Sequence, residues 1–407
     1  MTTAGTTSTP VRPGFSSWQA DRGARPLGGR SQLLGAVGVV AVLLGTQTLA
    51  ASTPQPSDVR LLLPSEGLLA GLGDGLRRGY GLAMEQSRSC GITPPSLQLG
   101  WLPPGTDPLP ALRNASRSAL LVAPPAAPLA PYGQLADQQQ LTVLLPLQRG
   151  RSLEGLPQLR GSDRLWPIVP ARSLEADRLA QGLLADGIRR VMVVRDPSAE
   201  SRALSERFLA SFSNGKGVLI GPSDEAISLD GDDKQAVAQL VGDVDWYRPP
   251  ALVVITGPDS RLARSLRQAA WPEGMLLAWS FRSDQPGSNQ QLGVDPLSRG
   301  PGWNRFAALF EQRWGYRPGL VESAGYDTGM IAALASVSAD GRPGWDLQWF
   351  SARARPLPLC EALEQRRSGA SVRPEGTTSR LDLSPGVSPG ADLRLSRTAA
   401  ISTRTTP

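Results

Sequence analysis

The feature of this sequence that most constrains its fold is a regular alternation of short apolar runs with segments of helical periodicity. The apolar runs span residues 59–63, 97–102, 119–123 and 141–147, and the helical segments span residues 68–84, 109–118 and 129–140. Continuous apolar runs are typical of parallel strands that are covered on both faces, whereas half-exposed strands alternate polar with apolar residues. The pattern therefore predicts an α/β fold with a doubly wound parallel sheet.

The same alternation starts again after the irregular, charged segment 149–164. The second series of predicted helices spans residues 174–186, 201–212, 234–241 and 260–270, and its predicted strands span residues 190–194, 217–220, 251–256 and 275–279. Two successive units of similar size predict a protein of two lobes with a cleft. Further helices are predicted at residues 303–314 and 326–337. Polar-apolar alternation at residues 379–383 and 393–396, about a Ser-Pro-Gly turn, predicts a terminal hairpin.

The N-terminal segment has the three-part layout of a secretory signal. Positive residues ending at Arg30 precede the apolar stretch 33–44, and small residues follow at Ala50 and Ala51. We expect residues 1–50 to be removed and the protein to be exported to the periplasm. The alternative is an uncleaved anchor in the inner membrane, because residues 31–51 carry no charge and are long enough to span a bilayer. Membrane contact is expected only through this segment, and only if it is not cleaved.

The absence of histidine narrows the choice of chemistry. A Ser-His-Asp hydrolase is excluded, and the commonest zinc ligand is missing from all 407 residues. Cys90 and Cys360 form no CxxC motif, so they make neither a cysteine-rich metal site nor a dithiol redox motif. The sequence leaves open whether these two cysteines are paired. We expect no catalytic residues, no metal site and no cofactor.

The positive charge of the chain does not indicate nucleic-acid binding. The formal net charge is +6, but residues 1–50 hold four arginines against Asp21, so half of that excess lies in the predicted signal segment. The other basic residues are scattered, and no basic run is interleaved with aromatic residues. A surface that follows a phosphate backbone needs clustered positive charge, so we expect no nucleic-acid partner.

Two segments carry a resemblance to a known family. Residues 63–92 (LPSEGLLAGLGDGLRRGYGLAMEQSRSCGI) resemble the opening of the periplasmic binding proteins of branched-chain amino-acid ABC transporters, with a strand, a glycine-containing turn and a long helix. Residues 303–334 (WNRFAALFEQRWGYRPGLVESAGYDTGMIAAL) resemble the late segment of the same family. The resemblance implies a type I fold of two doubly wound parallel-sheet lobes joined by a three-segment hinge.

The resemblance also implies a division of the chain. Residues 57–148 and 286–345 are expected to form the first lobe, residues 149–285 and 346–397 the second, and residues 398–407 a disordered tail. It implies that the protein captures a small ligand between the lobes and delivers it to the permease of an ABC importer. The competing hypothesis is an envelope scaffold or regulator of the same fold that binds a protein partner. An enzyme is the third reading, and no nucleophile and base pair supports it.

Candidate ligand-binding residues follow from the ends of predicted strands and the starts of predicted helices, where an open α/β sheet presents its crevice. They are Ser65, Trp101, Ala126, Ala127, Arg172, Ser198, Glu200 and Trp279. Backbone N–H groups of Ala126 and Ala127 are expected to bind a carboxylate, with Arg172 as an anion partner and Glu200 as an ammonium partner.

The sequence departs from the family at both expected contact points. The family has Gly-Pro followed by small residues and serine after the strand at 119–123, whereas this chain reads APPAAP at residues 123–128. The aromatic residue expected in the second lobe is also missing from RDPSAES at residues 195–201. We therefore expect a ligand other than a simple branched-chain amino acid.

Overall fold

The computed structural model describes residues 58–400, apart from residues 104–105, 107–109, 111, 113–118, 126 and 285–286. The predicted signal segment 1–50, most of the predicted helix at 109–118 and residues 401–407 of the predicted tail lie outside the described residues. In the part of the chain that is described, no helix is both long and apolar enough to cross a bilayer.

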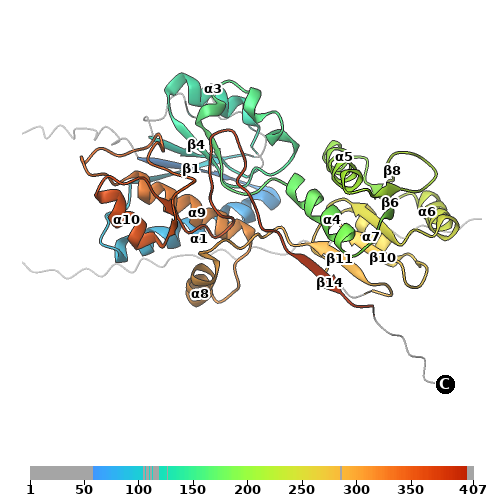
Figure 1. The fold of residues 1–407 in the computed structure, drawn as a ribbon. Helices are drawn as coiled ribbons and strands as arrows, with labels where there is room; N and C mark the ends of the chain where they lie inside the picture. The colour runs from blue at the N-terminus through green and yellow to red at the C-terminus, as the bar shows by residue number, and fades with distance from the viewer. Residues whose placement is uncertain are drawn as a thin grey trace, which may run out of the picture. The chain divides into compact units, whose positions relative to one another are not determined.

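A parallel sheet of five strands forms the centre of the first lobe (Figure 1). Its strand order is β2-β1-β3-β4-β5. The strands are β1 (Val59–Pro64), β2 (Leu97–Leu102), β3 (Leu120–Val122), β4 (Thr142–Leu145) and β5 (Leu165–Pro167). Helices α1 (Gly67–Ser89) and α9 (Leu320–Ala335) cover one face of this sheet, and α3 (Leu129–Gln139) covers the other.

Helices α1 and α9 pack closely because glycines stand where they meet. A Cβ atom on Gly325 of α9 would lie 2.1 Å from the backbone oxygen of Leu76 in α1. A Cβ atom on Gly79 of α1 would lie 1.9 Å from the backbone oxygen of Glu322 in α9. No other residue fits at either position without moving a backbone. Gly79 and Gly325, one from each of the family-like segments, therefore serve helix packing here.

The second lobe is built on a seven-stranded sheet with the order β14-β11-β10-β9-β6-β7, in which β8 pairs with β6. Its strands are β6 (Arg190–Arg195), β7 (Val218–Leu219), β8 (Ile227–Ser228), β9 (Ala251–Ile255), β10 (Leu276–Trp279), β11 (Gln291–Val294) and β14 (Leu395–Thr398). Only β14 of these runs antiparallel to its neighbour. Helices α4 (Ser173–Ala185) and α5 (Ala199–Asn214) pack on one face, and α6 (Lys234–Tyr247) and α7 (Arg261–Gln268) on the other.

The chain passes between the two lobes three times, as expected. Residues 168–172 lead from β5 into α4, and residues 295–302 lead from β11 into α8 (Trp303–Trp314). Residues 384–392 lead from the first core, which ends at Leu383, to the second core, which begins again at Leu393. The two doubly wound sheets and their triple connection confirm the predicted fold class.

The lobe boundaries differ from the expected ones. Residues 346–397 were expected in the second lobe, but the part from Leu347 to Leu383 packs in the core of the first lobe. This part holds β12 (Pro356–Leu357), α10 (Leu359–Arg367) and β13 (Arg373–Pro374). The reason is apolar burial: Leu363 and Val372 are almost fully covered by the core that also contains α1 and α9.

Two further segments change lobes relative to the expectation. Strand β5 was expected in the second lobe but pairs with β4, and β11 was expected in the first lobe but pairs with β10. The predicted terminal hairpin is wrong. Leu381 is buried in the first core, while β14 pairs with β11 through contacts such as Leu395 with Val294.

A disulfide bond resolves the question of the two cysteines. Cys90, which follows α1, is bonded to Cys360 at the start of α10. The two residues are 270 positions apart in the sequence. The bond joins the beginning and the end of the first lobe, because α1 and α10 belong to the same core.

Candidate functional site

A groove of about 720 Å³ lies at the carboxyl ends of β3 and β4, beside the first connection between the lobes. We call it the hinge groove, and its lining consists of Ala127, Pro128, Leu147, Gln148, Arg149, Gly150, Arg151, Ser152, Arg172 and Glu200. The first lobe supplies the start of α3 and the loop after β4. The second lobe supplies Glu200 from the first turn of α5. Both lobes therefore contribute to the groove.

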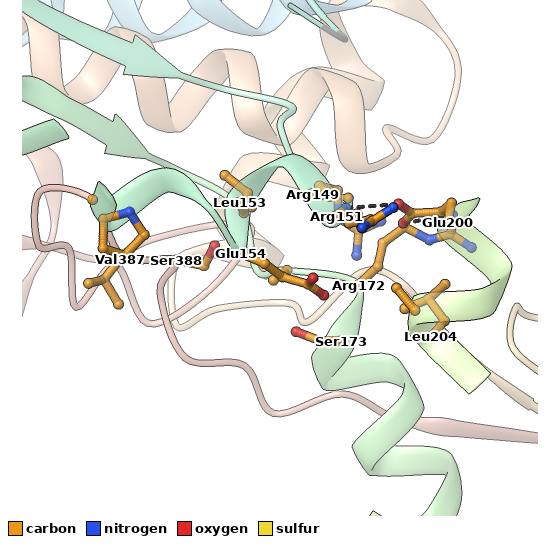
Figure 2. Close-up of a pocket in the computed structure, with 15 residues that line it drawn as sticks. Arg149, Arg151, Leu153, Glu154, Arg172, Ser173, Glu200, Leu204, Val387 and Ser388 are labelled. Atoms are coloured by element: carbon orange, nitrogen blue, oxygen red, sulfur yellow. Dashed lines mark hydrogen bonds and ion pairs between the residues drawn. The ribbon is translucent and has the colours of Figure 1, made fainter. Parts of the chain in front are cut away.

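A second, smaller cavity of about 210 Å³ shares five residues with the hinge groove. It extends away from them to Ala203 and Leu204 of α5 and to Gly386, Val387 and Ser388 of the third connection. Figure 2 shows Arg151 and Arg172 beside Glu200, at the far end of this cavity from Val387 and Ser388. The charged residues therefore stand where the two hollows meet.

Glu200 makes a direct contact between the lobes at this point. Its Oε2 atom accepts a hydrogen bond of 2.8 Å from the backbone N–H of Arg151, and its Oε1 atom lies 3.5 Å from Nη1 of Arg172. Gly150 allows this approach, since a Cβ atom there would lie 3.0 Å from Oε2 of Glu200. The Glu200 carboxylate thus joins the β4 loop of the first lobe to α5 of the second.

The position of Glu200 is fixed by the cap of its helix. Ser198 caps α5, because its Oγ atom accepts a hydrogen bond of 3.1 Å from the N–H of Ser201. Ser201 in turn donates 2.8 Å to Oδ2 of Asp196, which follows β6, and Thr256 donates 2.6 Å to the same oxygen. Burial raises the pKa of Asp196, but the hydrogen bonds from Ser198, Thr256 and Ser201 outweigh it and hold the pKa below its ordinary value.

A buried ion pair supports the base of the groove. Arg149 is bonded to Glu175 of α4, and the two side chains are 13% and 6% exposed. The Arg149 guanidinium also donates a hydrogen bond of 3.1 Å to the backbone oxygen of Pro170. The backbone oxygen of Arg149 accepts a hydrogen bond of 2.8 Å from the N–H of Arg172. These bonds hold the first connection against the β4 loop. The charge of Arg149 is thereby neutralised inside the protein.

Gln148 presents a buried amide at the groove. Its Nε2 atom donates to the backbone oxygen of Pro124 at 3.0 Å, so the amide is oriented by a carbonyl that can only accept. The side-chain oxygen has no hydrogen-bond partner among the described residues, although the residue is only 3% exposed. Gln148 therefore holds the proline-rich segment at the end of β3 against the loop after β4.

The structure brings together three of the predicted site residues. Ala127, Arg172 and Glu200 all line the hinge groove. Ser198 lies nearby as the cap of α5, but it does not line the groove. Ala126 lies outside the described residues.

Three predicted site residues face elsewhere. Ser65 is exposed after β1, where its N–H binds the oxygen of Leu102. Trp101 is 55% exposed on the edge strand β2. Trp279 is fully buried, and its Nε1 atom donates 3.0 Å to Oε1 of Gln291. Trp279 is part of the core between the sheet and α6 and α7, and it forms no wall of the groove.

Solved structures resemble this protein over most of its length, although no protein-family model and no curated protein sequence matches it significantly. A solute-binding protein of an ABC transporter from R. palustris, in complex with benzoate, is 17% identical with a TM-score of 0.57, and the match covers 84% of this chain and 92% of that one. The periplasmic ligand-binding protein of a branched-chain amino-acid ABC transporter from Burkholderia xenovorans is 13% identical with a TM-score of 0.60, covering 86% and 92%. An ABC transporter substrate-binding protein from Desulfitobacterium hafniense, in complex with Leu, is 12% identical with a TM-score of 0.57, covering 84% and 98%.

The chain has the type I periplasmic-binding-protein fold. In this fold, the hinge groove lies beside the first of the three connections. The expected family likeness of the two end segments is thereby confirmed at the level of the fold.

Reasoning from sequence missed the β4 loop as a source of groove residues. Gln148, Gly150, Arg151 and Ser152 all line the groove of this periplasmic-binding-protein fold, yet residues 149–164 read as an irregular charged segment. One signal was available, because two arginines flank a glycine directly after a predicted buried strand. The carboxyl ends of parallel strands meet at one edge of a sheet, so this Arg-Gly-Arg sequence belonged among the candidates.

Proposed function

We propose that this protein is an exported solute-binding protein that captures a small ligand in the hinge groove for an ABC importer. The fold supports this proposal, because the similar structures named above are solute-binding or ligand-binding proteins of ABC transporters. Two of them hold benzoate and Leu. The role requires a permease partner and no catalytic step.

The observation that carries the proposal is the composition of the hinge groove. Its polar groups come from the loop after β4, from the first connection and from α5 of the other lobe. A solute placed there contacts Arg151 from one lobe and Glu200 from the other, so binding and the approach of the lobes are linked. Pockets that bind small molecules combine an apolar wall with a few polar groups in this way.

Export is supported by two independent features. The N-terminal segment has the layout of a secretory signal, and the disulfide between Cys90 and Cys360 is typical of an oxidising compartment. We propose that residues 1–50 are removed and that the protein acts in the periplasm. Intact-mass analysis of the native protein tests this. Retention of Met1 or of neighbouring residues on a membrane-bound species favours an anchor through residues 31–51.

A thermal-shift screen of the full chain against small solutes tests the function. The panel consists of amino acids, aliphatic and aromatic carboxylates, amides and sugars, and a ligand at 100 times its dissociation constant stabilises the folded state by about 2.7 kcal/mol. The variant that tests the location is Ser152→Trp, because Ser152 is exposed and lines the groove, and its side chain makes no hydrogen bond to the described residues. A shift in the wild type that disappears in this variant supports the proposal. A panel without any shift contradicts it and favours a scaffold that binds a protein partner.

A further inference from the structure

We infer that the ligand of the hinge groove is an organic carboxylate with an apolar body and no ammonium group. The inference rests on the proposed function, since it names the class of solute that the groove takes. Three features carry it: an arginine without an ion-pair partner, a glutamate whose charge is already used, and a proline-containing apolar wall that is poor in backbone donors.

The charged lining of the groove favours an anion. It contains three arginines, Arg149, Arg151 and Arg172, and one carboxylate, Glu200. Arg149 is paired with Glu175, and Arg172 lies within ion-pair distance of Glu200 and of Glu175. Within the described part of the chain, the guanidinium of Arg151 has neither an ion pair nor a hydrogen bond. Arg151 is an exposed residue, and it is therefore the arginine of the groove lining whose guanidinium is available to an anionic ligand.

Guanidinium chemistry selects the carboxylate. The planar fork of an arginine presents parallel N–H donors that match the two oxygens of a carboxylate. Ser152 follows Arg151 in the groove lining and adds a hydroxyl. A small organic acid can therefore be bound through its carboxylate at this end of the groove.

An ammonium group has no free carboxylate in the groove lining, since Glu154 lines only the adjoining smaller cavity. The carboxylate of Glu200 accepts from the backbone N–H of Arg151 and faces the guanidinium of Arg172. Glu175 does not line the groove, and its side chain is only 6% exposed. An α-amino acid would bring its ammonium into a groove with excess positive charge, and an unpaired charge that loses its water costs several kcal/mol.

The remaining wall suits the apolar body of the ligand. Ala127, Pro128 and Leu147 form it. An adjoining cavity of about 20 Å³ shares Ala127 and Pro128, and its other lining residues are prolines and leucines together with Thr106 and Tyr132. Proline has no backbone N–H, so this stretch offers few donors to a second polar group of a solute. Apolar contact is the interaction that such a wall provides.

Two matched sets of probes test the inference by calorimetry on the full chain. The first set is 4-methylpentanoate, leucine and 4-methylpentanamide, and the second is 3-phenylpropanoate, phenylalanine and 3-phenylpropanamide. Within each set the apolar body is constant. Relative to the acid, the amino acid adds an ammonium group, and the amide replaces the charged carboxylate by a neutral group. The acid should bind at least about tenfold more tightly than its amino acid and its amide in at least one set, as expected for one charge-assisted hydrogen-bond pair.

The variant Arg151→Gln tests the assigned contact. It should weaken binding of the preferred acid by about tenfold to a hundredfold, because the charge-assisted bonds are lost. The matched control is Arg353→Gln, which removes the same charge at an exposed position outside the groove lining and should leave the affinity unchanged. Equal affinities of Arg151→Gln and the wild type would overturn the assignment.

The outcomes separate this inference from the proposed function. If leucine or phenylalanine binds as tightly as its acid, the inference is overturned and the solute-binding function stands. The same holds if no probe binds but a solute of the broad screen that is not a carboxylate does. If no solute of the broad screen binds, the proposed function fails with it. Tighter binding of an acid together with the loss in Arg151→Gln supports both.

Discussion

The carboxylate of Glu200 accepts a hydrogen bond of 2.8 Å from the backbone N–H of Arg151. This bond joins α5 of the second lobe to the loop after β4 of the first, at the place where the hinge groove and the smaller cavity meet. A hydrogen bond to a charged acceptor contributes about 1.5–3 kcal/mol when its partner groups are partly shielded from water. Glu200 therefore couples the position of the β4 loop to that of the second lobe.

Removing the carboxylate should release the Arg151 amide. In Glu200→Ala, hydrogen exchange at this N–H should be about tenfold faster or more, while the strands of both cores keep their protection. The control variant Glu364→Ala, at an exposed position in α10, should change nothing at Arg151. Identical exchange of the Arg151 amide in the wild type and in Glu200→Ala would show that the bond is not formed in solution.

Gly150 and Glu200 should be energetically coupled. A Cβ atom at residue 150 would lie 3.0 Å and 3.1 Å from the two carboxylate oxygens of Glu200, so Gly150→Ala should push this side chain away and cost about 1 kcal/mol. In the Glu200→Ala background the same change should be neutral or slightly stabilising, because alanine restricts the unfolded chain. Urea unfolding of the four proteins of this cycle measures the coupling. Additive free energies would contradict the predicted contact.

The disulfide between Cys90 and Cys360 should stabilise the first lobe. The double variant Cys90→Ser, Cys360→Ser should lower the free energy of unfolding by about 2–5 kcal/mol, since the bond closes a long loop in the unfolded chain. Wild-type protein treated with a thiol reductant should unfold at the same urea concentration as the variant. Two thiols that react in the untreated native protein would disprove the pairing.

Asp327 should make stability depend on pH. Its carboxylate is fully buried in α9 and accepts hydrogen bonds from Thr377 and Thr378. Burial raises its pKa to about 6, above the ordinary value, although these hydrogen bonds lower it. The folded state therefore binds more protons than the unfolded state between about pH 4 and pH 6. Its contribution to stability is fully present below pH 4 and is lost as the pH rises through 6.

The variant Asp327→Asn isolates this effect. From pH 4 to pH 7, the unfolding free energy of the wild type should decrease relative to that of the variant by on the order of 3 kcal/mol. Chemical unfolding at a series of pH values measures it. A difference that is constant over this range, or that grows with pH, would contradict the raised pKa.

Local patterns in the sequence predicted most helices and strands of the fold. The helix predicted at residues 303–314 has the same bounds as α8, because Trp303, Phe306 and Phe310 repeat at helical spacing and Gly315 ends the helix with φ of 75°. The pairing of strands and the assignment of the late segments were harder. Strand β14 pairs with β11, about a hundred residues earlier, and nothing in its four residues indicates that partner. Burial in the first core, not local periodicity, decides where α10 lies.

The lining of the hinge groove could be predicted from the sequence only in part. The rule that ligands bind at the ends of parallel strands selected Ala127, Arg172 and Glu200, which line the hinge groove and whose role in binding stays a prediction. It failed for Trp279, since a residue at the end of a strand can also point into the core, and only packing shows which. It missed Arg151, because the irregular segment after β4 has no periodicity from which its path can be inferred.

Calorimetric titration of the full chain with the solute that gives the largest thermal shift tests the central claim most directly. Saturable binding of one solute per chain is predicted, with an affinity at least about tenfold lower in Ser152→Trp, which adds a bulky ring to the lining of the hinge groove. The buried Ala127 gives a second variant, and Ala127→Trp should abolish binding if the variant folds. The absence of saturable heat for every solute, or an unchanged affinity in Ser152→Trp, would contradict the account.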